Sequence, residues 1–561
     1  MMNEQNPKPV FEVLANEIKS LGVEIVFGLM SDDTAQLCAT LDAIGVRFVG
    51  ARHENQAISM ADGFAAATGK VGVALVGRGP AFANGFNGLT YAKVTANPVL
   101  VMYGDAPANA GQANVSGPDY KAVGVNQGDV LNAASIRTFV TDTPDGAQSR
   151  LREAFAFAQG NRLSVLLMPT DVQNMSVVPV ESKQEQVTTP VGAVSRDAAA
   201  AHSIRLAADI LADKKRPIIV AGRGAVRADA KDEIVALAEK TGAMLMTSVL
   251  GKDWFRGHPF NLGVMGTFVT SLGRRFLAEA DCILVIGASL NALTMDFGDV
   301  FGAIPVIHLD ADRHAIGRWT AIDVALVGDA KKTVQALIEQ VSDNLDAPQH
   351  SESALQLVRD FDQAKDFEPM NTQRTLDARV VGQILNRILP KKRNLVFDGG
   401  NYMSCIPYID VEHPGDFKLT TETYSIGLGF GNAIGFAAGR PDETTMLMIG
   451  DGAFLMTMGE METVLREGIP LVIVAMNDCA YGSEVHVLRQ HGMPIALAQF
   501  PDIDLATLAE TLGYDAHIVR TQEQLEALAD VVSQADEPVF IEIKTNPEVA
   551  LASTDKMVSH D

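Results

Sequence analysis

Cysteine is scarce in this sequence, and long apolar runs are absent. The four cysteines are scattered (Cys38, Cys282, Cys405 and Cys479), and none belongs to a C-x-x-C pair. Such usage is typical of a reducing, cytoplasmic environment and argues against both a disulfide framework and a cysteine-based zinc site. No apolar stretch reaches the roughly 18 residues that a membrane span needs, and the first residues do not resemble a secretory signal. We therefore expect a cytoplasmic protein without a membrane partner.

Positive charge is also in short supply. Lysine and arginine total 45 against 69 aspartates and glutamates, which gives a formal net charge of −24. A chain of this charge repels polyphosphate backbones, so we expect no nucleic acid as a general partner. A small anionic substrate would need a local source of positive potential, such as a metal ion or the amino terminus of a helix.

The length of 561 residues is too great for one hydrophobic core, and the pattern along the chain predicts three domains. Short runs of Val, Ile and Leu alternate with longer stretches of helical periodicity, which is typical of parallel sheets covered by helices. The runs expected to form buried strands are 71–77, 98–104, 164–169, 217–222, 282–287, 305–310, 394–399, 445–452, 470–477 and 538–544. We predict an α/β fold of three doubly wound parallel-sheet domains. Their expected bounds are 1–180, 195–345 and 370–561, with polar linkers at about 171–197 and 341–373.

The strongest functional signal lies in the last predicted domain, where the strand TMLMIGDG ends in Gly450-Asp451-Gly452. A helix is expected from about Ala453, and Asp478 follows the next predicted strand. Parallel strands deliver their carboxyl ends to one edge of a sheet, so both aspartates can face one crevice. Paired carboxylates suit a hard divalent cation, and glycines before a helix amino terminus suit a phosphate. Taken alone, G-D-G is more often a turn with a helix cap.

The segment GDGAF, followed further on by Asn477-Asp478 in place of the usual N-N, resembles a known cofactor motif. It is that of thiamine diphosphate (ThDP) dependent enzymes of the acetolactate synthase and pyruvate decarboxylase superfamily. The resemblance implies Mg²⁺ held by Asp451, the side chain of Asp478 and the backbone carbonyl of Ala480. Other implied cofactor contacts are Gly450, Gly452, Ala453, Tyr481 and Gly482, with Gly400 and Asn401 from the segment DGGNYMS (398–404). The extra negative charge at 478 leaves the preferred ion open.

A second signal lies near the other end, in ARHENQAISMADGFAAATGK (51–70). A strand ending near Val49 leads through Glu54 into an alanine-rich helix, where a lone Glu would simply favour the first turn. R-H-E followed by A-x-G-x-A-x-x-T-G resembles, however, the catalytic glutamate motif of the same superfamily. The resemblance implies that Glu54 bonds N1′ of the aminopyrimidine and promotes the imino form, which removes the proton from C2 of the thiazolium.

Two further segments resemble this superfamily. Gly79-Pro80-Ala81 with Asn84 and Gly88 is similar to its G-P-G-x-x-N-x-x-x-G stretch, which adds Pro80 and Asn84 to the implied cofactor contacts. IGLGFGNAIG (426–435) is similar to the segment that presents an apolar wedge between the rings of the cofactor, and places Ile426 at the wedge. In isolation Ile426 would be an ordinary buried isoleucine. Because the two cofactor motifs come from different subunits in this superfamily, the resemblance implies at least a homodimer, and we expect a homotetramer.

The side chains above the reactive carbon decide which reaction such a scaffold runs. Asp32 falls where pyruvate decarboxylases carry an active-site aspartate, and Glu484 matches their active-site glutamate, but their adjacent histidine pair is absent. Gln127 resembles a glutamine of acetolactate synthases and could orient a second carbonyl substrate. His486 and His491 lie in the segment expected to cover the site, either as acids or bases or as surface histidines.

The middle segment resembles the central domain of the superfamily, which binds FAD in acetolactate synthases and ADP or nothing in relatives. G-R-G after a strand (222–224) is weak evidence for a nucleotide, and the G-x-H-G element of FAD-binding members stands here as GVMG (263–266), so FAD is left open. The sequence as a whole predicts a ThDP- and Mg²⁺-dependent enzyme that decarboxylates a 2-oxo acid and passes the acyl carbanion to an acceptor carbonyl or a proton. The alternatives are a C–C lyase or hydrolase acting on 2-hydroxy ketones, diketones or acyl-CoA, and a ThDP-binding scaffold without turnover.

Overall fold

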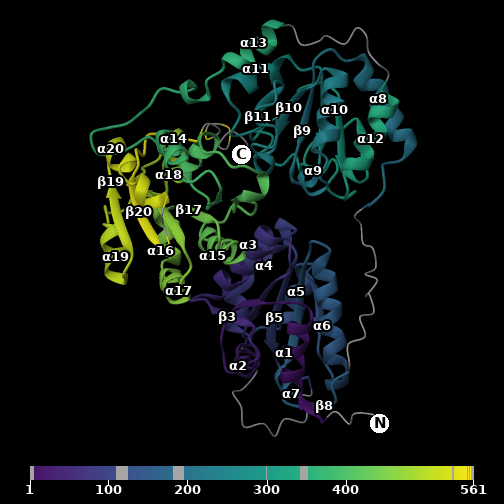
Figure 1. The fold of residues 1–561 in the computed structure, drawn as a ribbon, viewed down its shortest axis with the longest axis vertical. Helices are drawn as coiled ribbons and strands as arrows, with labels where there is room; N and C mark the ends of the chain where they lie inside the picture. The colour runs from purple at the N-terminus through teal and green to yellow at the C-terminus, as the bar shows by residue number, and fades with distance from the viewer. Residues whose placement is uncertain are drawn as a thin grey trace.

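The computed structural model describes residues 6–108, 124–180, 195–298, 300–341, 352–533, 536–551, 554 and 556. Three six-stranded parallel sheets with flanking helices follow one another along the chain (Figure 1). This confirms the α/β class and the three doubly wound domains. Within the described ranges, no helix is both long and apolar enough to cross a membrane.

The first sheet has the strand order β3-β2-β4-β5-β7-β6. Its strands are β2 (Ile25–Leu29), β3 (Arg47–Gly50), β4 (Gly72–Val76), β5 (Val99–Asp105), β6 (Arg137–Val140) and β7 (Leu163–Pro169). The helices are α1 (Val10–Ser20), α2 (Ala35–Ala43), α3 (Glu54–Thr68), α4 (Pro80–Thr95), α5 (Gln127–Ala133), α6 (Pro144–Gln159) and α7 (Thr170–Gln173). A short antiparallel pair, β1 (Lys8–Pro9) with β8 (Ser176–Val177), ties the end of this domain to its beginning.

The central sheet has the order β11-β10-β9-β12-β13-β14. Its strands are β9 (Pro217–Ala221), β10 (Met244–Thr247), β11 (Asn261–Val264), β12 (Cys282–Ile286), β13 (Val306–Asp310) and β14 (Val324–Val327). The helices are α8 (Ala201–Asp213), α9 (Arg223–Arg227), α10 (Lys231–Thr241), α11 (Ser271–Glu279) and α12 (Ala330–Gln340). The strand order reverses between β9 and β12, which is where open parallel sheets bind ligands.

The last sheet has the order β16-β15-β17-β18-β20-β19, which repeats the order of the first sheet. Its strands are β15 (Arg393–Phe397), β16 (Phe417–Leu419), β17 (Thr444–Gly450), β18 (Leu471–Asn477), β19 (Asp515–Val519) and β20 (Val539–Lys544). The helices are α14 (Ala378–Ile388), α15 (Gly429–Gly439), α16 (Asp451–Thr457), α17 (Glu460–Glu467), α18 (Gly482–Gln490), α19 (Leu505–Leu512), α20 (Gln522–Glu526) and α21 (Ala529–Ser533). Helix α13 (Glu352–Asp360), which precedes them in the chain, lies beside α11 of the central domain (Figure 1). Its order reverses between β15 and β17.

All ten predicted strands are confirmed, and their ends differ from the predictions by at most a few residues. The strands that the apolar runs did not reveal include the edge strands β6, β14 and β19, which are short and partly exposed. Both predicted linkers contain regular structure, which corrects the reading of them as plain connections. Helix α7 and strand β8 belong to the first domain, and α13 lies within the second predicted linker.

The first and last domains meet along helices α3 and α15, which lie side by side (Figure 1). One apolar core continues across this boundary and includes Ile58 from α3 and Phe430 from α15. Glycines let the two backbones approach closely: a Cβ on Gly63 would lie 2.1 Å from Asn432 O, and one on Gly435 would lie 1.8 Å from Met60 O. Larger side chains at these two glycines would force the helices apart.

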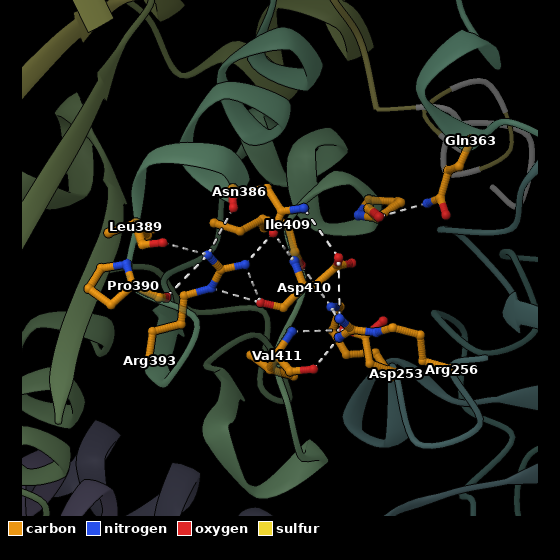
Figure 2. Close-up of polar contacts among 12 residues, drawn as sticks. Asp253, Arg256, Gln363, Asn386, Leu389, Pro390, Arg393, Ile409, Asp410 and Val411 are labelled. Carbon is orange, nitrogen blue, oxygen red and sulfur yellow. Dashed lines mark hydrogen bonds and ion pairs between the residues drawn. The ribbon is translucent and has the colours of Figure 1, made fainter. Parts of the chain in front are cut away.

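Arg393, at the start of β15, binds backbone carbonyls that surround it (Figure 2). Its Nε and Nη2 donate to Asp410 O at 2.9 and 2.8 Å, and its Nη1 donates to Asn386 O at 3.1 Å. The residue is 5% exposed, and burial lowers its pKa from the ordinary value. Beside it, Val411 N donates to Asp253 Oδ2 at 3.0 Å, which joins this segment to the central domain.

We expect Arg393→Met to destabilise the last domain, because it leaves buried carbonyls without donors while largely preserving side-chain volume. The expected loss is about 2–4 kcal/mol, seen as a lower midpoint of thermal unfolding in differential scanning calorimetry. Lys391→Met, two residues away and exposed, is the matched control. Equal midpoints for the two variants would contradict a structural role for the Arg393 contacts.

Candidate active site

A cavity of about 280 Å³ opens at the carboxyl ends of β15, β17 and β18. It lies where the strand order of the last sheet reverses, as expected for a ligand site in an open parallel sheet. Many predicted site residues line it: Gly400, Asn401, Ile426, Gly450, Asp451, Gly452, Ala453, Asp478, Ala480, Tyr481, Gly482 and Glu484. Segments separated along the last third of the sequence therefore share one wall.

The two predicted metal-binding carboxylates sit at the ends of adjacent strands. Asp451 is 6% exposed, and its Oδ1 accepts a hydrogen bond from Gly452 N at 2.9 Å. Asp478 Oδ1 accepts from Ala480 N at 3.2 Å. Burial, and then the charge of Asp451, raises the pKa of Asp478 to about 7, while burial raises the pKa of Asp451 to about 6. A divalent cation would offset the repulsion between these two carboxylates.

The donors at this point fit a hard cation such as Mg²⁺. The carboxylates of Asp451 and Asp478 and the carbonyl of Ala480 all offer oxygen, and Mg²⁺ commonly completes its shell with water and substrate phosphates. Across the residues that the structure describes, no group of three or more His, Cys, Asp or Glu side chains could hold a metal. The pair would therefore bind a cation together with backbone and phosphate oxygens, which suits a metal that bridges a diphosphate to the protein.

Two glycines make room inside this cavity. A Cβ on Gly452 would lie 2.7 Å from the ring of Tyr481, and one on Gly482 would lie 2.4 Å from Asp478 Oδ2. A side chain at either position would displace the tyrosine or the carboxylate. Helix α16 begins without a side-chain cap, so the first-turn N–H groups other than that of Gly452, which donates to Asp451, can receive a phosphate.

The side chain of Asn401 is engaged by the carboxy-terminal segment. Its Nδ2 donates to Val549 O at 2.6 Å, and its Oδ1 accepts from Leu551 N at 3.1 Å. Leu551 in turn lines the cavity. The side chain of Asn401 therefore supports the cavity wall. The predicted contact with the diphosphate would be made by the backbone of Gly400 and Asn401.

Glu54 occupies the first position of α3, 9% exposed. Its Oε2 accepts a hydrogen bond from Asn84 Nδ2 at 3.1 Å, on helix α4, which begins at Pro80. Two residues after Glu54, Gln56 Nε2 donates to the carbonyl of Gly427, the neighbour of Ile426. The structure thus brings the amino-terminal motif close to the turn that carries Ile426, which itself lines the cavity.

Comparison with known sequences agrees with this geometry. Residues 9–123, 204–337 and 398–543 match, in that order, the models of the N-terminal TPP binding domain, the central domain and the C-terminal TPP binding domain of thiamine pyrophosphate enzymes. The chain belongs to the thiamine pyrophosphate enzymes. Thiamine pyrophosphate is ThDP, the cofactor that both sequence motifs suggested.

This thiamine pyrophosphate enzyme is similar over nearly its whole length to acetolactate synthase large subunits. It is 26% identical to the probable acetolactate synthase large subunit of Methanocaldococcus jannaschii, over 96% of this chain and 92% of that protein. It is 24% identical to the acetolactate synthase large subunit of Haemophilus influenzae, over 95% and 94% respectively. It is also 26% identical to the sulfoacetaldehyde acetyltransferase of Castellaniella defragrans, over 84% and 81%.

Asp398, directly after β15, shapes the site of this thiamine pyrophosphate enzyme but was not predicted from the sequence. It is fully buried, and its carboxylate accepts from Gly399 N at 2.6 Å, Gly427 N at 2.9 Å and Gly429 N at 3.0 Å. Burial raises its pKa to about 6. These bonds fix the turn that presents Ile426. The sequence feature that could have revealed Asp398 is a carboxylate at the end of a buried strand, next to the glycines of D-G-G.

Asp32 and Gln127 are placed differently from each other in the first domain. The side chain of Asp32 is 74% exposed and pairs with Arg78 Nη2 at 3.4 Å. Gln127 is 2% exposed; its Oε1 accepts from Gly79 N at 2.8 Å and its Nε2 donates to Gly104 O at 3.0 Å. The Gln127 amide therefore ties the backbone before Pro80 to the end of β5, so its predicted role toward a second substrate has no support beyond the resemblance.

Glu484 and the two histidines predicted on the covering segment differ in their positions relative to the cavity. Glu484, in the first turn of α18, lines the cavity. His486 is buried in the same helix, and His491 is exposed just after it. Among the described residues that line the cavity, none is a histidine.

A second cavity, at the reversal between β9 and β12 of the central domain, bears on the FAD question. A Cβ on Gly222 would lie 2.3 Å from Gly287 O, and one on Gly224 would lie 2.8 Å from Gly287 Cα. The close contact of these two loops accounts for the glycines of G-R-G without a nucleotide. The binding of FAD, which the sequence left open, gains no support from this cavity.

Proposed function

We propose that this thiamine pyrophosphate enzyme is an acetolactate synthase-like carboligase. It would decarboxylate a 2-oxo acid and join the remaining acyl group to the carbonyl of a second molecule. The carrying observation is that the Ile426 turn and the Asp451–Asp478 pair line one cavity, and that Gln56 ties the helix of Glu54 to this turn. The chain is also related to acetolactate synthase large subunits. With pyruvate, two molecules and one proton would give one acetolactate and one CO₂.

The residues of the chain have separate tasks in this proposal. Bound ThDP would supply a nucleophilic carbon for the 2-oxo group and a positively charged thiazolium ring to take up the electron pair left when CO₂ departs. Asp451, Asp478 and the carbonyl of Ala480 hold the cation and, through it, the diphosphate. Glu54 exchanges a proton with the aminopyrimidine, and Ile426 fills the space between the two rings.

The walls of the cavity favour acyl transfer over release of an aldehyde. Leu293 and Phe297 of the central domain and Leu551 near the carboxyl terminus bring apolar surface to it. Apart from the metal pair, Glu484 is the one carboxylic acid among the described lining residues, and no histidine accompanies it. Because the described lining has no histidine and no carboxyl group besides these three, proton transfer to the acyl group is disfavoured and an acceptor carbonyl can compete for it.

A product assay tests the proposal. The purified protein, loaded with ThDP and Mg²⁺, is given pyruvate and other 2-oxo acids singly and in pairs, and CO₂, acetolactate-type products and free aldehyde are measured. We expect CO₂ release together with the two-substrate product. Free aldehyde as the main product would contradict carboligation and indicate a simple decarboxylase. Cleavage of 2-hydroxy ketones, diketones or acyl-CoA without CO₂ would favour the lyase or hydrolase alternative, and cofactor binding without any turnover would favour a scaffold.

Ile426→Ala should lower turnover about ten- to a hundredfold, because the cofactor loses the support that aligns its reacting groups. Affinity for ThDP should change little, since the diphosphate and the cation are held elsewhere. Ile426→Leu is the matched control, because it keeps the side-chain volume. Steady-state kinetics and cofactor titration check both variants; equal turnover in the two would contradict the wedge assignment.

We also propose Mg²⁺ as the resident cation, a homodimer as the minimum active unit, a homotetramer as the assembly and the cytoplasm as the location. Two large apolar side chains of the last domain outside the cavity lining are available to a partner: Met456 is 61% and Leu497 95% exposed. Size-exclusion chromatography with light scattering tests the assembly, and a monomer at working concentration would exclude both oligomers.

A further inference from the structure

The backbone just before Glu54 is bound to the last domain by a buried carboxylate. Glu460, at the start of α17, accepts hydrogen bonds from the N–H groups of Arg52 at 2.8 Å and His53 at 3.1 Å through its Oε1. Its Oε2 accepts from Thr463 Oγ1 at 2.8 Å, and the residue is 1% exposed. The strand-to-helix turn that delivers Glu54 therefore rests on a side chain of the other domain.

The backbone just after Glu54 is bound to the last domain by a buried amide. Gln56 Nε2 donates to Gly427 O at 2.7 Å, and Gln56 Oε1 accepts from Gly431 N at 2.8 Å. Gln56 is 2% exposed. Gly427 follows Ile426 directly and Gly431 lies in the first turn of α15, so one side chain links the helix of Glu54 to the turn of Ile426.

Most of the remaining contact between these helices is apolar and rich in glycine, as at Gly63 and Gly435. At the opposite end from Glu54, Arg440 Nε, directly after α15, donates to Ala67 O of α3 at 2.8 Å. Apolar surfaces give attraction without direction, so by themselves they leave the position of α3 along α15 loosely defined. Buried hydrogen bonds have one good geometry and are costly when unmade, which makes them the groups that specify register.

We infer that Gln56 and Glu460 are positioning residues that hold Glu54 in register with the Ile426 turn across the boundary between the first and last domains. The inference rests on the proposed function, because it concerns how Glu54 meets the aminopyrimidine. Neither side chain lines the cavity among the described residues, and both act through backbone groups next to Glu54 or Ile426. Gln56 and Glu460 would therefore affect the rate of proton exchange by aligning Glu54. The affinity for ThDP would depend on the diphosphate site instead.

The test uses the full chain loaded with ThDP and Mg²⁺. The variants are Gln56→Leu, Glu460→Leu and Glu460→Gln, of which the last keeps an oxygen that can accept from Arg52 and His53. Gln173→Leu is the control, because Gln173 is also buried, at 4% exposed, and its Nε2 donates to Met168 O at 2.8 Å far along the chain from the site. Three quantities are measured: exchange of the C2 proton of bound ThDP into D₂O by quenched-flow NMR, ThDP affinity, and the thermal unfolding midpoint.

We expect proton exchange to slow about ten- to a hundredfold in Gln56→Leu and in Glu460→Leu, with ThDP affinity nearly unchanged. Glu460→Gln should restore most of the rate, and Gln173→Leu should lower only the unfolding midpoint. Adding Gln56→Leu to Glu54→Gln should slow exchange no further, because residues that act through one group are not additive.

Normal exchange in folded Gln56→Leu and Glu460→Leu would overturn the inference and leave both residues as ordinary interdomain contacts. If Gln56→Leu does not fold, the two Glu460 variants decide the matter alone. Glu54→Gln separates this failure from failure of the proposed function. Slow exchange in Glu54→Gln with normal exchange in the positioning variants removes only the inference, whereas normal exchange in Glu54→Gln removes the function on which it rests.

Discussion

Glu54→Gln should reduce turnover about 10²- to 10⁴-fold while ThDP still binds, because the amide cannot exchange the proton that the carboxyl group exchanges. The substitution keeps the size of the side chain and an oxygen to accept from Asn84 Nδ2, so the local structure at the start of α3 should persist. Steady-state kinetics with a 2-oxo acid measures the loss. Exchange of the C2 proton of bound ThDP should slow to a similar extent.

Glu24→Gln is the matched control, because the side chain of Glu24 is 77% exposed and lies in the same domain. Its turnover should equal that of the wild type. Turnover in Glu54→Gln within a few-fold of the control would end the assignment of Glu54 as the proton-exchanging group. Loss of ThDP binding in Glu54→Gln would instead mean that Glu54 serves mainly to hold the cofactor.

The buried strands were predictable because they are covered on both faces, which demands continuous apolar runs such as 445–449 and 471–476. Edge strands are not under this demand. β14 alternates buried and exposed residues, and β19 buries only Val519 fully, so neither stands out from a loop or a short helix in sequence. Helix α13 was missed for a related reason, since it buries no residue and lies in a polar stretch.

The site was predictable where its chemistry lies at strand ends. Asp451 and Asp478 each follow an apolar run directly, and parallel topology brings such ends together without further information. Asp398, Gln56 and Glu460 act through backbone N–H and carbonyl groups of segments distant in sequence, and those partners are fixed only by tertiary packing. The residue type of a side chain does not predict which distant backbone group it will bind.

Asp32 and Gln127 show the limit of transfer by resemblance. Both stand in segments similar to those of relatives, yet the orientation of a side chain depends on its immediate neighbours. The exposed Asp32 pairs with Arg78, and the Gln127 amide is hydrogen-bonded to the backbone of Gly79 and Gly104. A residue can therefore match a motif in position while its polar atoms are committed elsewhere.

Asp451 and Asp478 should respond differently to loss of charge. Asp451→Asn should weaken binding of Mg²⁺, and with it ThDP, at least about a hundredfold, because the cation loses its more strongly acidic ligand. Asp478→Asn should bind Mg²⁺ within a few-fold of the wild type, since the amide oxygen remains a ligand and the repulsion between two buried carboxylates disappears. Mg²⁺ titration at fixed ThDP, followed by circular dichroism, measures both, with exposed Asp142→Asn as the control.

The same pair sets a pH dependence that Asp478→Asn should change. Burial and the charge of Asp451 raise the pKa of Asp478 to about 7, so below that pH a proton competes with the cation for this carboxylate. In the wild type, Mg²⁺ affinity should therefore fall as the pH drops below about 7 and level off above it. Asp478→Asn should shift this fall toward the pKa of Asp451, about 6. A wild-type affinity that stays flat across both pKa values would mean that the cation is not held by this pair, because protonation of a ligand must weaken the site that it builds.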